Sequence, residues 1–345
     1  MIFLFILFYS IVFSQDYGDI YIDASLGDAS YLNPILAADS ASAAINSLVY
    51  NGLVKYDKDL VLIGDLAERW EIKKDGREII FYLRKDVYWH DGAKFTSKDV
   101  KFTYEKLIDP NVRTPYSSDF ELIEKCEIID DYTIKFIYRE PFVPALESWG
   151  IGIIPEHIFN NPQYDFNTHS ANRSPIGTGP YKFVKWVSDE KIELVANENY
   201  FEGRPYIQKY IFRIIPDQSV QFLELLNESI DSMNLTAEQF YAYSEFFKNY
   251  NKFSYPSFSY TYLGFNLKNP LFKDKKVRQA IAHAINKHEI INGVLLDKGQ
   301  PATGPFPLQS WAYNENVKDF DYDIDKAKKL LEESGWRYNE DKEIL

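Results

Sequence analysis

The sequence predicts a mixed α/β protein with two domains, and three observations support this fold class. The chain has 345 residues, a length for which two domains are the ordinary expectation. Stretches of alternating apolar residues, typical of strands, are followed by stretches with helical spacing, so both element types occur along the chain. No segment repeats at a fixed period, so a solenoid of stacked repeats is not expected.

The composition is that of a soluble globular protein, with 46% hydrophobic and 26% charged residues. Lys and Arg total 38 against 51 Asp and Glu, which gives a net charge of −13. Such an acidic surface repels phosphate backbones, so nucleic acid is not an expected partner. Aromatic residues make up 17% of the chain, and besides the core we expect them to line a ligand cleft.

The N-terminus carries a short apolar segment that is typical of a secretory signal. Residues 2–13 are apolar apart from Tyr9 and Ser10, and this run is too short to cross a bilayer as a helix. We expect residues 1–14 to be a signal peptide cleaved near Ser14-Gln15, although a buried first strand is the alternative. No cysteine follows the run, so we expect a soluble periplasmic protein without a lipid anchor.

The first elements are a strand, a short helix and an antiparallel sheet. Residues 16–34 read as a strand that runs into a Gly/Asp/Ser loop closed by Asn33-Pro34, and a helix of small residues follows over 37–50. Between Lys55 and Leu83 the pattern alternates and is interrupted by turn signals, and residues 78–84 (EIIFYLR) are the clearest strand.

The segment YWHDGAKFTSKDVKFTYEKL, residues 88–107, permits a catalytic or a purely structural interpretation. Trp89-His90-Asp91 could begin a metal or catalytic cluster, but Asp91-Gly92 is a strong turn dipeptide directly after a strand. Thr96 then precedes Asp99 by three residues, the spacing of a capping box at a helix start. His90 has no second ligand nearby, so we predict a turn followed by a helix.

The later part of the chain predicts a second group of strands followed by helices. Gly177 and Gly179 in PIGTGPYKFVKW flank what we expect to be a sharp turn. Asp323 or Asp325 should cap the last helix. The expected strands cover 192–201, 206–216 and 258–267, and the expected helices cover 219–229, 231–240, 275–295 and 322–336.

No specific catalytic, metal or cofactor motif accompanies these elements, so we expect no enzyme, no metal and no cofactor. HEIIN at 288–292 ends in Asn292 where a zinc-protease signature requires a second His. Cys126 is the single cysteine and lies in an apolar alternating run, where it should be a small core residue. Asp130-Asp131 lies at a hairpin turn, which leaves a secreted hydrolase with paired carboxylates and an aromatic cleft as the alternative function.

Six segments in order resemble one family, the solute-binding proteins of ABC importers, family 5. They are GDLAERWEIKKDGREIIFYLRKDVYWHDGAKFTSKDVKFTYEKL (64–107), IIPEHIF (153–159), SPIGTGPYKFVKW (174–186), NPLFKDKKVRQAIAHAINKHEIINGVL (269–295), GQPATGPFP (299–307) and YDIDKAKKLLEESGW (322–336). Each segment is unspecific alone, but their order over about residues 20–336 makes the resemblance specific.

The resemblance implies a periplasmic-binding-protein-like fold of two α/β lobes (class II), with an extra subdomain on lobe I. It places lobe I at 15–45 and 172–262, the inserted subdomain at 46–171, and the start of lobe II at 263–345. Family members continue beyond the equivalent of residue 345, so the second lobe is expected to be incomplete and the reading frame truncated or split. For the same reason we expect residues from about 268 onward to be less stable, and peptide affinity to be weak or absent.

The function implied by the resemblance is capture of a peptide by closure of the two lobes, followed by delivery to permease subunits in the inner membrane. The protein would act as a monomer, and a nickel chelate or an oligosaccharide is the alternative ligand within the family. Carried onto this sequence, the residues expected to face the ligand are Asp28, Ala29, Ser30, Tyr116, Trp149, Asn234 and Tyr262.

Overall fold

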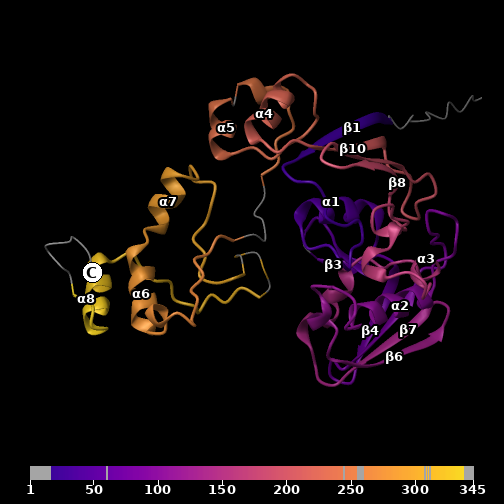
Figure 1. The fold of residues 1–345 in the computed structure, drawn as a ribbon, viewed down its shortest axis with the longest axis horizontal. Coiled ribbons are helices and arrows are strands. Elements are labelled where there is room, and N and C mark those ends of the chain that lie inside the picture. Colours follow the sequence, from indigo (N-terminus) through magenta and orange to yellow (C-terminus); the bar gives the residue numbers. More distant parts are fainter. Residues whose placement is uncertain are drawn as a thin grey trace, which may run out of the picture. The chain divides into compact units, whose positions relative to one another are not determined.

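The computed structural model describes residues 17–337, apart from residues 60, 244, 255–259, 307, 309 and 311. The chain divides into two compact units, of which unit 1 ends at Met233 and unit 2 begins at Asn234 (Figure 1). The expected signal peptide, residues 1–14, lies outside the described residues.

The first sheet of unit 1 combines segments from both ends of the unit. Its strand order is β1-β10-β9-β8, in which β1 (Gly18–Ser25) runs parallel to β10 (Ile207–Ile214). The strands β9 (Lys191–Ala196) and β8 (Tyr181–Val187) complete it in antiparallel order. The chain therefore leaves this sheet after β1 and returns to it only at β8.

The intervening segment forms a second, antiparallel sheet with the order β4-β5-β7-β6. The predicted strand over 78–84 is confirmed as β5, in which Ile79, Phe81 and Leu83 are buried. The strand bounds are β4 Ala67–Lys73, β5 Glu78–Leu83, β6 Ile123–Asp130 and β7 Thr133–Tyr138; a small hairpin joins β2 (Val54–Tyr56) to β3 (Leu62–Gly64).

The predicted turn and capped helix at 88–107 are confirmed. Gly92 has a φ of 93°, and its N–H donates to the Trp89 carbonyl over 2.8 Å. Helix α2 (Ser97–Leu107) begins with the predicted capping box, in which the backbone N–H of Thr96 donates to the Asp99 carboxylate over 2.9 Å. Val100, Tyr104 and Leu107 are buried, and the helix packs against β6 and β7 (Figure 1).

Helix α1 (Ser40–Val49) explains why glycine occupies both positions of the PIGTGP segment, in which the chain bends at 178–180. Neither glycine has a positive φ. Instead, a Cβ on Gly177 would lie 1.8 Å from the Val49 carbonyl oxygen, and one on Gly179 would lie 2.5 Å from that of Leu48. The glycines allow the backbone to approach the end of α1, where the Gly179 N–H donates to the Val49 carbonyl over 2.8 Å.

The remaining helices of unit 1 are short. Helix α3 spans Glu156–Phe159, and α4 spans Gln218–Leu226 with Asp217 as its N-cap. The helix predicted over 219–229 is therefore present, with bounds shifted towards the N-terminus.

Unit 2 is helical, and its described residues contain no strand. The strand expected over 258–267 is absent from residues 260–267, and residues 258 and 259 lie outside the described part. The helix bounds are α5 Ala237–Ala242, α6 Lys275–Ala284, α7 Lys287–Gly293 and α8 Ile324–Glu333. The prediction of a helix from residue 231 was also wrong, since α5 begins at Ala237.

The single helix predicted over 275–295 is two helices. Ile285 adopts an extended conformation with a ψ of 115°, and the Asn286 side chain accepts from the Glu289 N–H over 3.1 Å to start α7. Helices α6 and α8 pack together, with Lys276 and Glu333 in an ion pair of 2.8 Å. Asp323 caps α8, as one of the two predicted alternatives.

Candidate functional site

The loop that precedes α1 is fixed to the first sheet of unit 1 through Asp28. This carboxylate accepts hydrogen bonds from the Trp186 Nε1 at 3.0 Å and from the backbone N–H of Asp189 at 3.0 Å. Ala29 is buried beside it. Both predicted site residues therefore hold the loop in place, and their side chains are engaged within the protein.

The end of the same loop is fixed by an amide pair. The Asn33 Nδ2 donates to the Asn172 Oδ1 over 2.8 Å, and both side chains are buried. The Leu32 N–H donates to the Asn172 carbonyl over 2.8 Å. Such paired, buried polar groups leave the loop little freedom, so its exposed part is pre-organised.

Ser30 is the exposed member of the predicted loop residues, and it lies at the N-terminus of α1. Its hydroxyl donates to Asp39, the N-cap of α1, and Asp39 also accepts from the Ser42 N–H over 2.8 Å and the Ser42 hydroxyl over 2.7 Å. Burial acts to raise the pKa of Asp39, but these hydrogen bonds outweigh it and leave the pKa below its ordinary value. The carboxylate is therefore a stable anion at neutral pH.

Tyr116 joins this loop to the segment before β6. Its hydroxyl donates to the carbonyl of Ala37, two residues before the N-cap Asp39 of α1, over 2.6 Å. Burial raises the pKa of Tyr116, so the hydroxyl keeps its proton for this hydrogen bond. Ser30 and Tyr116 therefore both contact the part of this loop that ends at Asp39.

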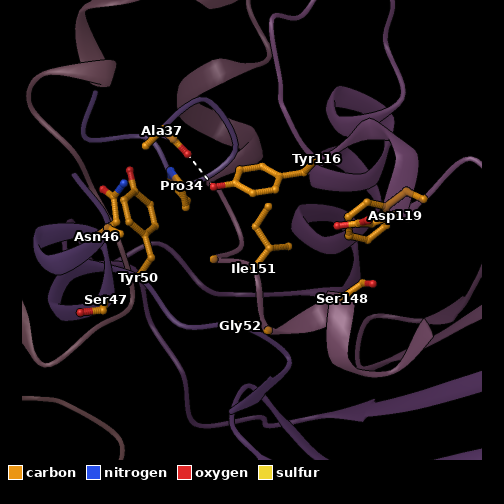
Figure 2. A pocket seen from close by; sticks show the side chains of 14 residues that line it. Pro34, Ala37, Asn46, Ser47, Tyr50, Gly52, Tyr116, Asp119, Ser148 and Ile151 are labelled. Atoms are coloured by element: carbon orange, nitrogen blue, oxygen red, sulfur yellow. Dashed lines mark hydrogen bonds between the residues drawn. The ribbon is translucent and has the colours of Figure 1, made fainter. Parts of the chain in front are cut away.

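Next to Tyr116 lies a pocket of about 370 Å³ between α1, the loop before it and residues 116–120 and 148–152 (Figure 2). Figure 2 shows Asn46, Ser47 and Tyr50 along one side and Tyr116 and Ser148 on the other. We name it the α1 pocket; its lining residues are Pro34, Ala37, Ala43, Asn46, Ser47, Tyr50, Gly52, Tyr116, Asp119, Phe120, Ser148, Gly150, Ile151 and Gly152.

Trp149, a predicted ligand-facing residue, is instead a central side chain of the core and has no exposed surface. Its ring centroid lies 4.2 Å from that of Phe136 and 5.1 Å from that of Phe120. Its Nε1 donates to the Tyr138 hydroxyl over 3.4 Å. We therefore remove Trp149 from the candidate site, because a ligand could contact it only after the core had opened.

Asn234 and Tyr262, the last two predicted residues, belong to unit 2. Asn234 is exposed, and Tyr262 is 74% exposed with its ring centroid 5.5 Å from that of Tyr260. The candidate site described within unit 1 therefore consists of the loop before α1, Tyr116 and the α1 pocket.

Asn46 is the pocket residue that sequence reasoning missed. It lies on the inward face of α1 with Ser42 and Tyr50, four residues away on either side, and it is only 6% exposed. A polar amide on the buried face of an otherwise small and apolar helix was the available signal, because buried polar groups require a partner.

The Trp89-His90-Asp91 motif connects parts of unit 1, in agreement with its predicted structural role. The Gly177 N–H donates to His90 Nδ1 over 3.2 Å, so Nε2 carries the proton that is shared with the Gly179 carbonyl at 3.0 Å. Burial lowers the pKa of His90 to about 4, and the ring is neutral at neutral pH. Asp91 contacts His157 Nε2 over 2.8 Å.

Among the described residues, no group of three or more His, Cys, Asp or Glu side chains is placed to hold a metal ion. Burial raises the pKa of the Cys126 thiol to about 12, so it is not an activated nucleophile. Asp130, the last residue of β6, accepts from the Tyr132 N–H over 2.8 Å and so stabilises the turn to β7. None of the described helices is long and apolar enough to cross a membrane.

Unit 1 is thus an α/β unit that carries a fixed loop and a pocket beside α1. Residues 61–345 match the model of the bacterial extracellular solute-binding proteins, family 5. The chain belongs to this family, and its fold class is the one predicted.

Individual relatives agree with this assignment. The oligopeptide-binding protein AppA of Bacillus subtilis is 35% identical over 331 residues, which cover 94% of this chain and 60% of AppA. The structure of AppA in complex with a nonapeptide matches with a TM-score of 0.86, 33% identity and coverage of 95% of this chain and 66% of that one. NikZ from Campylobacter jejuni in complex with Ni(L-His) matches with a TM-score of 0.84, 35% identity and coverage of 95% and 65%. The chain thus spans about 60–66% of the length of these relatives.

Proposed function

We propose that this protein is the extracytoplasmic solute-binding component of an ABC importer and that it binds peptides. Family membership over residues 61–345, together with the similarity to AppA, whose structure holds a nonapeptide, is the observation that carries this proposal. Ser30, on the loop before α1, and Tyr116, which contacts this loop at Ala37, are ligand-facing residues, and an extended peptide would lie along their exposed surface. Main-chain hydrogen bonds would give the affinity, and spacious pockets would accept different side chains.

In this function the chain is divided into the lobes that the family resemblance implies. Residues 15–45 and 172–262 form lobe I, residues 46–171 are its inserted subdomain, and residues 263–345 begin lobe II. The pairing of β1 with β10, and of β8 with β9, supports the discontinuous lobe I. In this assignment Tyr262 lies where the chain passes between the lobes, and Asn234 is a ligand contact from lobe I.

The remaining parts of the proposal follow from the role in import. The protein acts as a monomer in the periplasm after removal of residues 1–14, and its partners are the permease subunits of the importer. It has no enzymatic activity, since a component that delivers its ligand must leave it unchanged.

To test this function, the purified chain is incubated with a pool of peptides that ranges from dipeptides to nonapeptides, and the peptides that stay bound are identified. We expect intact peptides to be retained weakly by the purified chain and released on unfolding, as identified by mass spectrometry. A protein that retains no peptide above the level of an unrelated acidic protein contradicts the proposal. Recovery of cleaved peptides would instead support the hydrolase.

A nickel chelate is the second candidate ligand, because NikZ in complex with Ni(L-His) is 35% identical. The same protein should be tested with nickel alone, with histidine alone and with both together. Calorimetric binding that requires both components, in the absence of peptide binding, would favour this ligand over peptides.

A further inference from the structure

The accessible hydroxyl groups that line the α1 pocket present only acceptors to it. The hydroxyls of Ser47, Ser148 and Tyr116 each donate their proton to a backbone carbonyl, over 2.8, 3.0 and 2.6 Å respectively. A hydroxyl whose proton is engaged in this way offers an occupant only its oxygen lone pairs. The amide of Asn46 is not part of this accessible lining, because both of its polar atoms are shielded from solvent.

Asp119 adds a negative charge to the same lining. Its side chain is half-buried and borders the pocket opposite α1 (Figure 2). The carboxylate accepts from the neighbouring Ser118 hydroxyl over 3.4 Å, and it forms no ion pair with a described Lys, Arg or His side chain. The residues that line the pocket include no other charged side chain, so nothing in the lining neutralises Asp119.

A second groove, which runs along α2 and has a volume of about 550 Å³, shows the contrast. It is also lined by carboxylates, but these lie beside lysines that line the same groove. Lys101 and Glu105 approach to 3.6 Å, and Lys106 and Asp109 approach to 3.8 Å. The groove along α2 therefore contains its own cations, whereas the α1 pocket does not.

The negative charge also acts inside the α1 pocket. Burial is the largest cause of the raised pKa of Tyr116, and the charges of Asp39 and Asp119 raise this pKa further. Since the Tyr116 side chain lines the pocket, both carboxylates contribute a negative potential there. Such a potential attracts a cation and repels an anion.

These features together select the kind of occupant. An ammonium group has three N–H donors and no acceptor, so it matches a lining of acceptors, whereas a carboxylate or an amide oxygen would find no side-chain donor. Pro34, Ala43 and Ile151 supply apolar surface for a stem, and the volume of about 370 Å³ lies at the lower end of the about 300–1,000 Å³ usual for small-molecule sites. We propose that the α1 pocket is a subsite for an ammonium group on an aliphatic stem, as in a lysine side chain of the ligand, with Asp119 as its counter-ion.

This inference rests on the proposed function only in assigning the ammonium group to a peptide, so a probe that is not a peptide tests the pocket first. Butylammonium is added to full-length protein that carries ¹³C-labelled methyl groups of Ile and Ala, and 1-butanol is the uncharged control. We expect butylammonium to shift the methyl signals of Ile151 and Ala43 and to bind about fivefold more tightly than 1-butanol. High salt should reduce this difference, because it screens the attraction between partly exposed charges.

The variant Asp119→Asn separates recognition from a structural role. It keeps the shape of the side chain and removes its charge, so it should melt at the same temperature as the wild type and bind both probes alike. Asp19→Asn removes the same charge at an exposed site on β1 and should retain the preference for butylammonium. Ala43→Met enlarges an exposed side chain of α1 that lines the pocket, and it should weaken the binding of both probes. The inference is wrong if the wild type shows no preference or if Asp119→Asn keeps it.

Peptides form the second arm of the experiment. Among peptides that bind, one with lysine should bind about fivefold more tightly than one with norleucine at the same position, and Asp119→Asn should remove this difference. Acetylation of the peptide N-terminus should leave the preference intact. If acetylation removes it instead, the pocket holds the terminal ammonium group and the assignment to lysine is wrong. If butylammonium binds as expected but no peptide does, the pocket stands and the proposed peptide function fails.

Discussion

The two units differ in how they bury their side chains. Unit 1 has a continuous core in which strands and helices far apart in sequence meet, including the rings of Phe81, Phe136 and Trp149. In the described part of unit 2, only four side chains are buried, and all belong to α6 and α8: Val277, Ala280, His283 and Ala327. Unit 1 is therefore stabilised by long-range packing, whereas local signals at helix ends account for much of the structure of unit 2.

This comparison predicts the largest effect for Trp149→Ala. Truncation of a fully buried indole among three other rings removes about 3–5 kcal/mol of unfolding free energy. Phe253→Ala in unit 2 is the control, and at 82% exposure it should cost less than about 0.5 kcal/mol. Chemical denaturation followed by far-ultraviolet circular dichroism, which reports on the backbone and not on the deleted indole, measures the unfolding free energy of both variants. Equal losses would show that the two units do not differ in this way.

His90 predicts a pH dependence that is confined to unit 1. Its folded pKa of about 4 lies below the ordinary value of 6.5, so the unfolded chain takes up the proton first as the pH falls. The contribution of neutral His90 to the unfolding free energy should therefore be fully present above about pH 6.5 and decline between about pH 6.5 and 4. Below about pH 4 this group should cause no further change. The full difference corresponds to about 3 kcal/mol.

The variant His90→Ala tests this assignment. It removes the acceptor of the Gly177 N–H and should cost about 1–3 kcal/mol at neutral pH. It should also flatten the pH profile of the unfolding free energy between about 4 and 6.5. A profile that remains steep in His90→Ala would assign the dependence to other groups.

A pair of glycines gives the next smaller effect. Gly177→Ala would place a Cβ 1.8 Å from the Val49 carbonyl oxygen, so α1 must move, at a cost of about 1–3 kcal/mol. Gly293→Ala, the last residue of α7, has open space around it and should stabilise its helix by about 0.5–1 kcal/mol. Thermal melting shows whether each variant raises or lowers the melting temperature. A similar decrease in both variants would contradict the predicted contrast.

The sequence predicted those elements that depend on neighbouring residues. The capping box of Thr96 and Asp99, the turn at Gly92 and the cap at Asp323 are all interactions over three residues or fewer, so each is visible in the local sequence. The division between α6 and α7 was also visible, because Asn286 precedes Glu289 by three residues, but the continuous apolar pattern obscured it.

The parts that were missed depend on distant partners. Trp149 was expected to face the ligand because the family resemblance implied it, but its burial is decided by the packing of Phe81, Phe120 and Phe136 around it. Asn46 was missed for the same reason. Its helical position could have indicated a buried amide, but only the structure shows that neither amide atom has a partner among the described residues.

The smallest effects come from the helix caps, and these test the comparison most directly. Thr96→Ala and Asn286→Ala each remove a side-chain cap, worth about 1 kcal/mol. Because α2 is packed in the core of unit 1, we expect Thr96→Ala to lower the global stability of that unit by this amount. In α7 no residue is buried, so Asn286→Ala should instead speed local amide exchange over 287–293 about fivefold and leave the melting of unit 1 unchanged. Hydrogen exchange read by mass spectrometry resolves the two segments. A loss of protection in the strands of unit 1 caused by Asn286→Ala would mean that the units unfold as one, and that local signals alone do not maintain α7.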